Sequence, residues 1–148
     1  TYHPGAFDDH GYFEGPVEGF VATLQPGVWS HFTRTQHFAG NLQIEFRTPD
    51  HARAESYAVA HHVGPAPDGG ERDLVWGLRY VDDFERRAGE WRIARRVCAW
   101  DWHRVDPVGG IPLPPSYFRG HTSSQDPVYA FPCPHGRRVE PASLLAKQ

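Results

Sequence analysis

The sequence of 148 residues contains no methionine and only two cysteines. Without a methionine, Thr1 cannot be the natural start, so we expect an N-terminal piece to precede it. Cys98 and Cys133 make no disulfide framework and match no zinc spacing, which favours a reducing, cytoplasmic location. No run approaches the roughly 20 apolar residues that cross a bilayer, and no signal peptide is visible, so we expect no membrane partner.

The charge of the chain argues against a polyanionic partner. The formal net charge is −3, and no basic stripe could follow a phosphate backbone, so we expect no nucleic acid. Ten histidines raise the question of a metal. No histidine pair has the spacing of a recognised site, and the neighbours His61 and His62 point to opposite faces of a strand. We therefore expect no metal and no other cofactor.

The N-terminal part contains one helical pattern. Residues 1–15 are turn-rich, with a strand or loop through 8–13. Pro16 suits the first position of a helix, and Pro26-Gly27 would end it. Between them, apolar residues recur at helical spacing, so we predict a short amphipathic helix over 16–25. These apolar residues are Val17, Phe20, Val21 and Leu24.

After residue 29 the apolar period changes to two, which is typical of half-buried strands. Leu42, Ile44 and Phe46 alternate with polar residues. Further strands are predicted over 52–63, 73–87 and 90–104, and short turns join them. Short links between long strands imply antiparallel neighbours, so we predict a curved four-stranded antiparallel sheet within 32–104.

Both faces of the last two strands are apolar. Alternation places Trp76, Leu78 and Tyr80 opposite Val75 and Val81. On the next strand the same alternation predicts two groups that project to opposite faces. One group is Ala94, Arg96, Cys98, Trp100 and Trp102, and the other is Ile93, Val97 and Ala99. A sheet covered on both faces has this pattern. One face would meet helices and a pocket, and the other a second subunit, so we expect a homodimer or homotrimer.

The composition changes near residue 107. Proline and glycine become dense, which predicts an extended tail over 107–148 with a terminal helical turn over 141–147. We therefore expect a folded domain over 1–106 and this tail.

Three segments resemble SnoaL-like proteins of the nuclear-transport-factor-2-like superfamily. They are YHPGAFDDHG at 2–11, TQHFAGNLQIEF at 35–46 and YVDDFERRAGEWRI at 80–93. The resemblance covers residues 1 to about 106. It implies an α+β, cystatin-like fold in which a cone-shaped, strongly curved antiparallel sheet packs on helices. In that fold a helical pair precedes the helix at 16–25, and we expect the pair to lie before Thr1. In the dehydratase-like members this missing part carries an aspartate that orients the catalytic histidine.

The family includes scytalone dehydratase, bile-acid dehydratase and hexachlorocyclohexane dehydrochlorinase. The resemblance therefore implies a cofactor-independent lyase or isomerase. A base would remove a proton beside an activating group of a hydrophobic cyclic molecule, and a small leaving group would depart or a double bond shift. Two alternatives remain open. The same fold could serve as a non-catalytic binding or assembly module, or as the small subunit of a ring-hydroxylating oxygenase.

The resemblance assigns His37 as the catalytic base, because it occupies the position of the family's histidine. Imidazole titrates near neutrality and suits proton abstraction. Arg96, which the hairpin register places in the cavity, or Tyr80 would stabilise the developing negative charge. The structural alternatives are a histidine that only bonds its neighbours and an arginine paired with Asp82 or Asp101.

The remaining candidates are pocket walls. An aromatic content of 14% favours a ring-shaped apolar ligand. Asp8 and Asp9 would lie at the pocket mouth, where one could replace the missing acid or both could cap turns. Cys98 has apolar neighbours in the sequence, so we do not expect it to form a reactive thiolate. Each wall residue could equally be ordinary core: Phe13, Trp29, Phe32, Ala58, Ala60, His62, Trp76, Leu78, Cys98 and Trp100.

Overall fold

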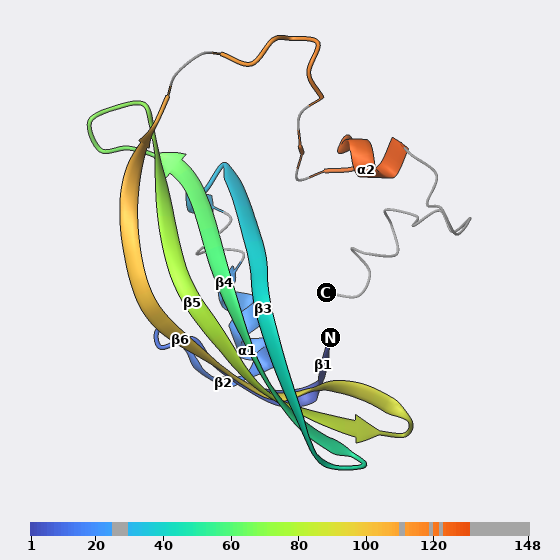
Figure 1. Ribbon diagram of the computed structural model, residues 1–148. Helices are drawn as coiled ribbons and strands as arrows, with labels where there is room; N and C mark the ends of the chain where they lie inside the picture. The colour runs from blue at the N-terminus through green and yellow to red at the C-terminus, as the bar shows by residue number, and fades with distance from the viewer. Residues whose placement is uncertain (25–29, 110–111, 119, 122, 131–148) are drawn as a thin grey trace. The chain divides into compact units, whose positions relative to one another are not determined.

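The computed structural model describes residues 1–24, 30–109, 112–118, 120–121 and 123–130. The chain divides into two compact units, residues 1–109 and 110–148. The first unit contains six strands and a helix, which Figure 1 shows as long, bent strands with a helix on one side. In chain order they are β1 (Tyr2–Asp9), β2 (Glu14–Pro16), α1 (Val17–Leu24), β3 (Arg34–Thr48), β4 (His51–Pro65), β5 (Glu71–Arg87) and β6 (Glu90–Val108).

All six strands belong to one curved, unclosed sheet in the order β2-β1-β6-β5-β4-β3. The antiparallel meander from β3 to β6 confirms the four predicted strands, with ends that extend a few residues further. The expectation of a purely antiparallel sheet is corrected, because β1 pairs with β6 in parallel. Without β1, the amide and carbonyl groups along that edge of β6 would lack partners. The result is a mixed sheet.

Two tight features of the meander follow from local sequence. Ala88 and Gly89 both have positive φ angles, of 51° and 84°, as the two central residues of a narrow hairpin turn require. Gly69 and Gly70 also have positive φ in the longer β4–β5 connection. These turns fix the pairing of β4 with β5 and of β5 with β6, and so determine which side chains share a face.

The pairing registers of β3 to β6 define two faces of the sheet, an inner face and an outer face. The inner face carries His37, Ala60 and Trp76, which lie opposite one another on β3, β4 and β5. The outer face carries the next row, Phe38, Val59, Gly77 and Trp102. Residues directly opposite on paired strands project to the same side, so the first row assigns three strands and the second row four.

Two β-bulges in β6 correct the predicted alternation of that strand. Gly77 pairs with Trp102, whereas the next residue, Leu78, pairs with Trp100, so one extra residue, Asp101, is accommodated. Trp102 therefore lies on the outer face and not beside Trp100. It covers Gly77 so closely that a Cβ there would lie 2.0 Å from the indole. A second bulge, where Asp83 pairs with Arg95 and Phe84 with Ile93, places the buried Ile93 on the inner face.

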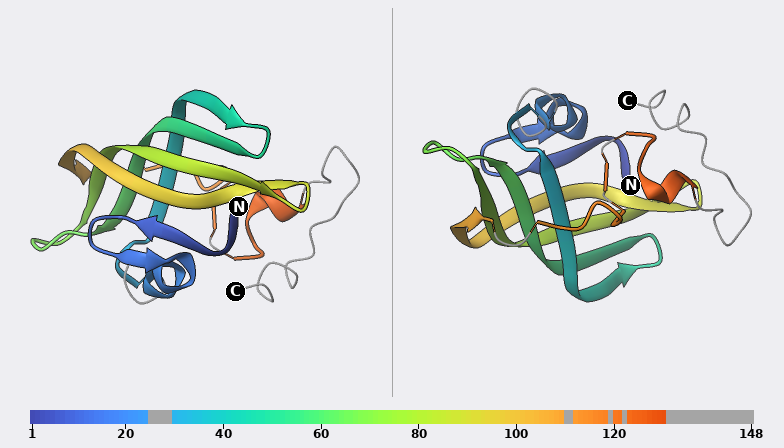
Figure 2. Two further views of the ribbon diagram at one scale, coloured as in Figure 1. Left: turned by 90° about the horizontal axis from the view of Figure 1, so that it is seen from below. Right: turned by 90° about the horizontal axis from the view of Figure 1, so that it is seen from above.

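Helix α1 confirms the short helix predicted over 16–25. It packs against β1 and β2, as Figure 2 shows from two sides. The first residues of the chain already form strand β1, where the sequence pattern indicated turns. No helix of the described residues is long and apolar enough to cross a membrane.

The second unit is not extended throughout, as the tail was expected to be. Helix α2 (Pro127–Ala130) interrupts it, and Asp126 caps this helix by accepting a hydrogen bond from the Val128 amide at 2.9 Å. The terminal helical turn predicted over 141–147 lies outside the described residues, as does Cys133.

The core of the sheet lies on the inner face. Ala58, Ala60, Leu78 and Cys98 form one buried cluster, and the rings of Trp76 and Tyr80 pack against it. Small alanines on β4 give room for these large rings. The rings of Trp76 and Tyr80 are called the ring layer below, and they cover the buried cluster.

Candidate functional site

A cavity of about 470 Å³ opens on the inner face, within the size range of small-molecule sites. Its walls come from the β1–β2 loop, the segment before β3, and strands β4, β5 and β6. They are mainly aromatic and apolar, and two imidazoles are the main polar groups. The lining residues are His10, Gly11, Tyr12, Phe32, His62, Leu74, Trp76 and Trp100.

Three hydrogen bonds hold the β1–β2 loop in place. The His10 amide donates to the Phe13 carbonyl at 2.9 Å, and the Gly11 amide donates to the Asp9 carboxylate at 2.9 Å. The Trp100 indole donates to the His10 carbonyl at 3.0 Å. Gly11 has a φ of 77° and lies against this indole, so a side chain there would be strained. The loop is thereby fixed across the end of the cavity.

The loop brings His10 onto the carboxylate of Asp8. Asp8 is fully buried, and His10 is 9% exposed. The carboxylate only accepts hydrogen bonds, so Nδ1 of His10 donates to Oδ1 of Asp8. Tyr2 donates to the other carboxylate oxygen at 2.9 Å. The His10 ring is stacked on Phe20 of α1, with centroids 4.1 Å apart. Asp8 thus orients an imidazole at the cavity wall, whereas Asp9 only supports the loop.

Sequence reasoning considered Asp8 but did not single out His10. The available signal is the spacing of two residues, since positions i and i+2 of a strand project to the same face. Ala6, Asp8 and His10 are all buried, as this alternation requires. The run Asp-Asp-His-Gly is typical of an exposed turn, and this masked the signal.

His37 lies next to His62, which lines the cavity, but His37 is not itself one of the lining residues. Their ring centroids are 5.3 Å apart, in an edge-on arrangement. His37 belongs to β3, an exposed strand, but desolvation of its imidazole lowers its pKa, and the charges of His10 and His61 lower it further. Burial followed by the charge of His37 lowers the pKa of His62. Among the described residues, Nδ1 of His62 is the buried side-chain polar atom without a hydrogen-bond partner. A ligand could supply that partner.

Arg96 forms a bidentate ion pair on the inner face and is not one of the residues that line the cavity. Both hydrogen bonds to the Asp82 carboxylate are 2.7 Å long. Burial acts to lower the pKa of Arg96, but the hydrogen bonds and charge of Asp82 outweigh it and raise that pKa. The guanidinium also lies 4.1 Å from the ring centroid of Tyr80. Burial raises the pKa of Tyr80, so its hydroxyl stays protonated.

The structure distributes the predicted wall residues over several places. Phe32, His62, Trp76 and Trp100 line the cavity. Phe13 packs against Phe20, with ring centroids 5.9 Å apart. Trp29 lies outside the described residues. The other four lie in the core below the ring layer: Ala58, Ala60, Leu78 and Cys98. Burial raises the pKa of the Cys98 thiol to about 12, which keeps it protonated.

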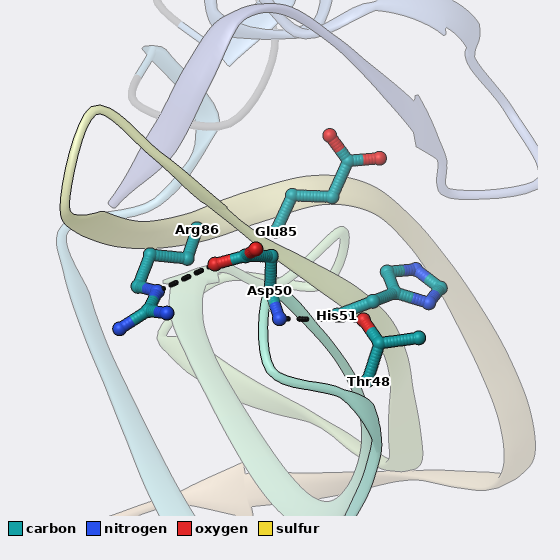
Figure 3. Close-up of a pocket in the computed structure, with 5 residues that line it drawn as sticks. All are labelled: Thr48, Asp50, His51, Glu85 and Arg86. Atoms are coloured by element: carbon teal, nitrogen blue, oxygen red, sulfur yellow. Dashed lines mark hydrogen bonds and ion pairs between the residues drawn. The ribbon is translucent and has the colours of Figure 1, made fainter.

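A second hollow, of about 390 Å³, lies at the β3–β4 turn, where Figure 3 shows its lining. Arg86 donates to Asp50 at 2.7 Å, and the Asp50 amide donates to Thr48 at 3.3 Å (Figure 3). Its walls are polar and none of the predicted site residues lies there. Nor do the described residues contain a group of three or more histidines, cysteines or acids that could hold a metal. The aromatic cavity is therefore the candidate site.

Comparison with protein families matches residues 3–97 to the SnoaL-like domain. This is more than half of the chain. The protein belongs to the SnoaL-like domain family. The matched range contains all but the first residue of β1, all of α1 and β2 to β5, the first part of β6 and the Asp8–His10 pair.

Known relatives of this SnoaL-like domain include enzymes. Over 105 residues the chain is 26% identical to a gamma-hexachlorocyclohexane dehydrochlorinase of Sphingobium indicum. The match covers 71% of this chain and spans 64% of the length of that relative.

Solved structures share the fold. A type 2 hexachlorocyclohexane dehydrochlorinase superposes with a TM-score of 0.61 at 21% identity, covering 78% of this chain and 77% of that one. A proposed scytalone dehydratase from Novosphingobium aromaticivorans superposes with a TM-score of 0.59 at 19% identity, covering 75% and 77%. These likenesses confirm the cone-shaped, nuclear-transport-factor-2-like fold predicted for the SnoaL-like domain.

Proposed function

We propose that this SnoaL-like protein is a cofactor-independent lyase or isomerase that acts on a hydrophobic cyclic molecule. The observation that carries the proposal is His37, an imidazole with a lowered pKa, in contact with His62, which lines an aromatic-walled cavity. A neutral imidazole can accept a proton, and aromatic walls favour a ring-shaped substrate. Family membership and a dehydrochlorinase relative support the same type of activity.

In the proposed reaction, His37 removes a proton from a carbon beside an activating carbonyl. The electron pair of that C–H bond moves toward the carbonyl oxygen. A donor near this oxygen would stabilise the negative charge. Of the two sequence candidates, the geometry favours Tyr80, because its hydroxyl stays protonated while the guanidinium of Arg96 is bound to Asp82. In this arrangement Arg96 supports the ring of Tyr80, and Nδ1 of His62 would bond a polar group of the substrate.

Deuterium exchange tests the proton-abstraction step without a leaving group. The bicyclic ketone 1-tetralone would be incubated with protein in D₂O, and loss of its C2 protons followed by NMR. We expect catalysed exchange, and a decrease of about 100-fold or more in His37→Gln, as for loss of a general base. His61→Gln is the matched control, since His61 projects to the outer face and is bonded to Asp73 at 2.6 Å. Equal exchange rates in wild type and His37→Gln would refute the role of His37.

The same cavity also suits binding without chemistry, because no described residue forms a hydrogen bond with the buried Nδ1 of His62. Tryptophan fluorescence would distinguish the two functions, since Trp76 and Trp100 line the cavity. Quenching by 1-tetralone without any catalysed exchange would favour the binding module.

A further inference from the structure

His62 is a wall residue of the cavity whose hydrogen bonding is incomplete. Among the described residues, none bonds the buried Nδ1 of its imidazole. The backbone at this position is well fixed, because the His62 amide donates to the carboxylate of Asp73 at 3.1 Å and His62 pairs with Leu74 of β5. Buried polar atoms of folded proteins are nearly always bonded, so an unpartnered one at a cavity indicates a missing ligand group.

The state of the ring defines what that ligand group does. Burial lowers the pKa of His62 and the charge of His37 lowers it further, so the ring is neutral at neutral pH. A neutral imidazole has one N–H and one nitrogen that accepts. A hydrogen bond from the ring to the backbone carbonyl of Leu74 acts on this pKa in the opposite direction, and a carbonyl accepts only from the N–H. Because no described residue bonds Nδ1, the N–H is at Nε2 and Nδ1 is the accepting nitrogen. The ligand therefore has to donate.

The charges around the cavity disfavour an anionic ligand. Within the described part of the chain, its walls carry no lysine, arginine, aspartate or glutamate. Arg96, on the same face, is bound to Asp82 through two hydrogen bonds of 2.7 Å. Arg72 of β5 is exposed and is not one of the wall residues. Moving a carboxylate from water into such surroundings is costly without a counter-charge. The ligand that fits is uncharged.

Aromatic rings determine the shape of the space. Trp76 and Trp100 come from neighbouring strands and meet edge-on, with ring centroids 4.9 Å apart. Phe32 is tilted against His62, with ring centroids 5.1 Å apart. Flat aromatic walls suit a planar ring. The donor group of such a ring belongs on the edge that lies against Phe32 and His62.

We propose that His62 selects an uncharged ring compound that carries a hydroxyl group, by accepting a hydrogen bond from this hydroxyl at Nδ1. The inference rests on the proposed function and deepens it by naming the class of molecule that the cavity takes. The hydroxyl is a recognition group that stays on the molecule. A compound without this donor leaves Nδ1 unpaired, and a carboxylate finds no counter-charge in the walls.

Three naphthalenes of similar shape provide the test. At neutral pH, 2-naphthol donates a hydrogen bond, 2-methoxynaphthalene only accepts one, and 2-naphthoate is an anion. Ligand-detected NMR would give a dissociation constant for each compound with the wild type. We expect 2-naphthol to bind about five- to tenfold more tightly than 2-methoxynaphthalene, as for one buried hydrogen bond. It should bind at least about tenfold more tightly than 2-naphthoate.

Variants at position 62 isolate the effect of the nitrogen. His62→Phe keeps a ring and removes the acceptor, so the preference for 2-naphthol over 2-methoxynaphthalene should fall about fivefold or more. His62→Asn places an amide oxygen close to the position of Nδ1 and should retain part of the preference. His61→Phe, on the outer face, is the matched control and should retain all of it. Circular dichroism checks each fold, and the wild-type comparison needs no variant.

Equal affinities of the wild type for 2-naphthol and 2-methoxynaphthalene would overturn the proposal. A preference that persists in His62→Phe, or tighter binding of 2-naphthoate than of 2-naphthol, would do the same. The proposed function fails separately, because 2-naphthol has no carbonyl for the exchange step. If the hydroxyl preference holds while His37→Gln leaves 1-tetralone exchange unchanged, the base is wrong and the ligand class stands. If exchange falls in His37→Gln and the preference is absent, the base stands and the ligand class is wrong.

Discussion

At the scale of single residues, the imidazoles of the cavity have different surroundings, and these suit them to different tasks. His10 is bonded to a buried carboxylate, which fixes the orientation of its ring. His37 has no such partner among the described residues, and desolvation followed by the charges of His10 and His61 lowers its pKa. One imidazole is therefore held in a fixed orientation, whereas the lowered pKa of the other suits it to accept a proton.

The pH dependence of deuterium exchange should report the base. The neutral form of His37 is active, so the rate is fully present above its pKa and is lost as pH falls through that pKa. Because the pKa of His37 is lowered from 6.5, the acid limb should lie below pH 6.5. The measurement is the rate of 1-tetralone exchange against pH, with His37→Gln as the reference. A limb at or above pH 6.5, or the same limb in the variant, would contradict the assignment.

At the scale of elements, the ion pair between Asp82 of β5 and Arg96 of β6 joins two strands below the cavity. Its side chains are 5% and 19% exposed, whereas those of the Asp101–Arg79 pair on the same strands are 34% and 32% exposed. Removing one partner of a buried pair leaves an unpaired charge, which costs far more than loss of a solvated pair. The two pairs therefore differ in importance despite similar geometry.

Asp82→Asn should lower the free energy of unfolding by about 3 kcal/mol, because Arg96 stays buried without a counter-charge. Asp101→Asn, which disrupts the more exposed pair, should cost far less, because solvent already screens that pair. Urea denaturation of both variants and the wild type measures the difference. Equal losses in the two variants would show that burial does not set the strength of the inner pair.

Sequence patterns predicted the meander well because alternation and glycine-rich turns are local signals. Three features were not accessible in this way. The parallel pairing of β1 with β6 depends on which edge is free, and no residue of β1 encodes that. The bulges at Ala94 and Asp101 shift the alternation of β6 by one residue each, so Ile93 and Trp102 were assigned to the wrong faces. His10 was overlooked because its neighbours resemble a turn, although the structure folds that turn over the cavity.

At the scale of the whole molecule, the outer face of the sheet bears large apolar side chains. Phe38, Tyr57 and Trp102 are 57%, 43% and 46% exposed. Phe38 and Tyr57 lie on neighbouring strands, and Phe38 and Trp102 belong to one row across the sheet. Exposed apolar patches of this kind are typical of contact surfaces. The sequence-based expectation of a homodimer or homotrimer through this face therefore stays a prediction.

Light scattering should give the mass of two or three chains for the wild type. Phe38→Lys should reduce that mass, because a charge would be buried in the contact. Leu42→Lys is the control, since Leu42 is similarly exposed, at 61%, but lies on the inner face. A wild type with the mass of a single chain would exclude the predicted assembly.

The alanines of β4 have a consequence for the selectivity of the cavity. Ala58 and Ala60 lie below the rings of Trp76 and Tyr80, and Ala60 separates His37 from Trp76 along one row. A larger side chain at either position would lift a ring into the cavity, because packed interiors have little spare room. The shape offered to a ligand is thus set by a layer of residues beneath the walls. Such a layer lets a single substitution alter which molecules fit while every group that contacts them keeps its identity.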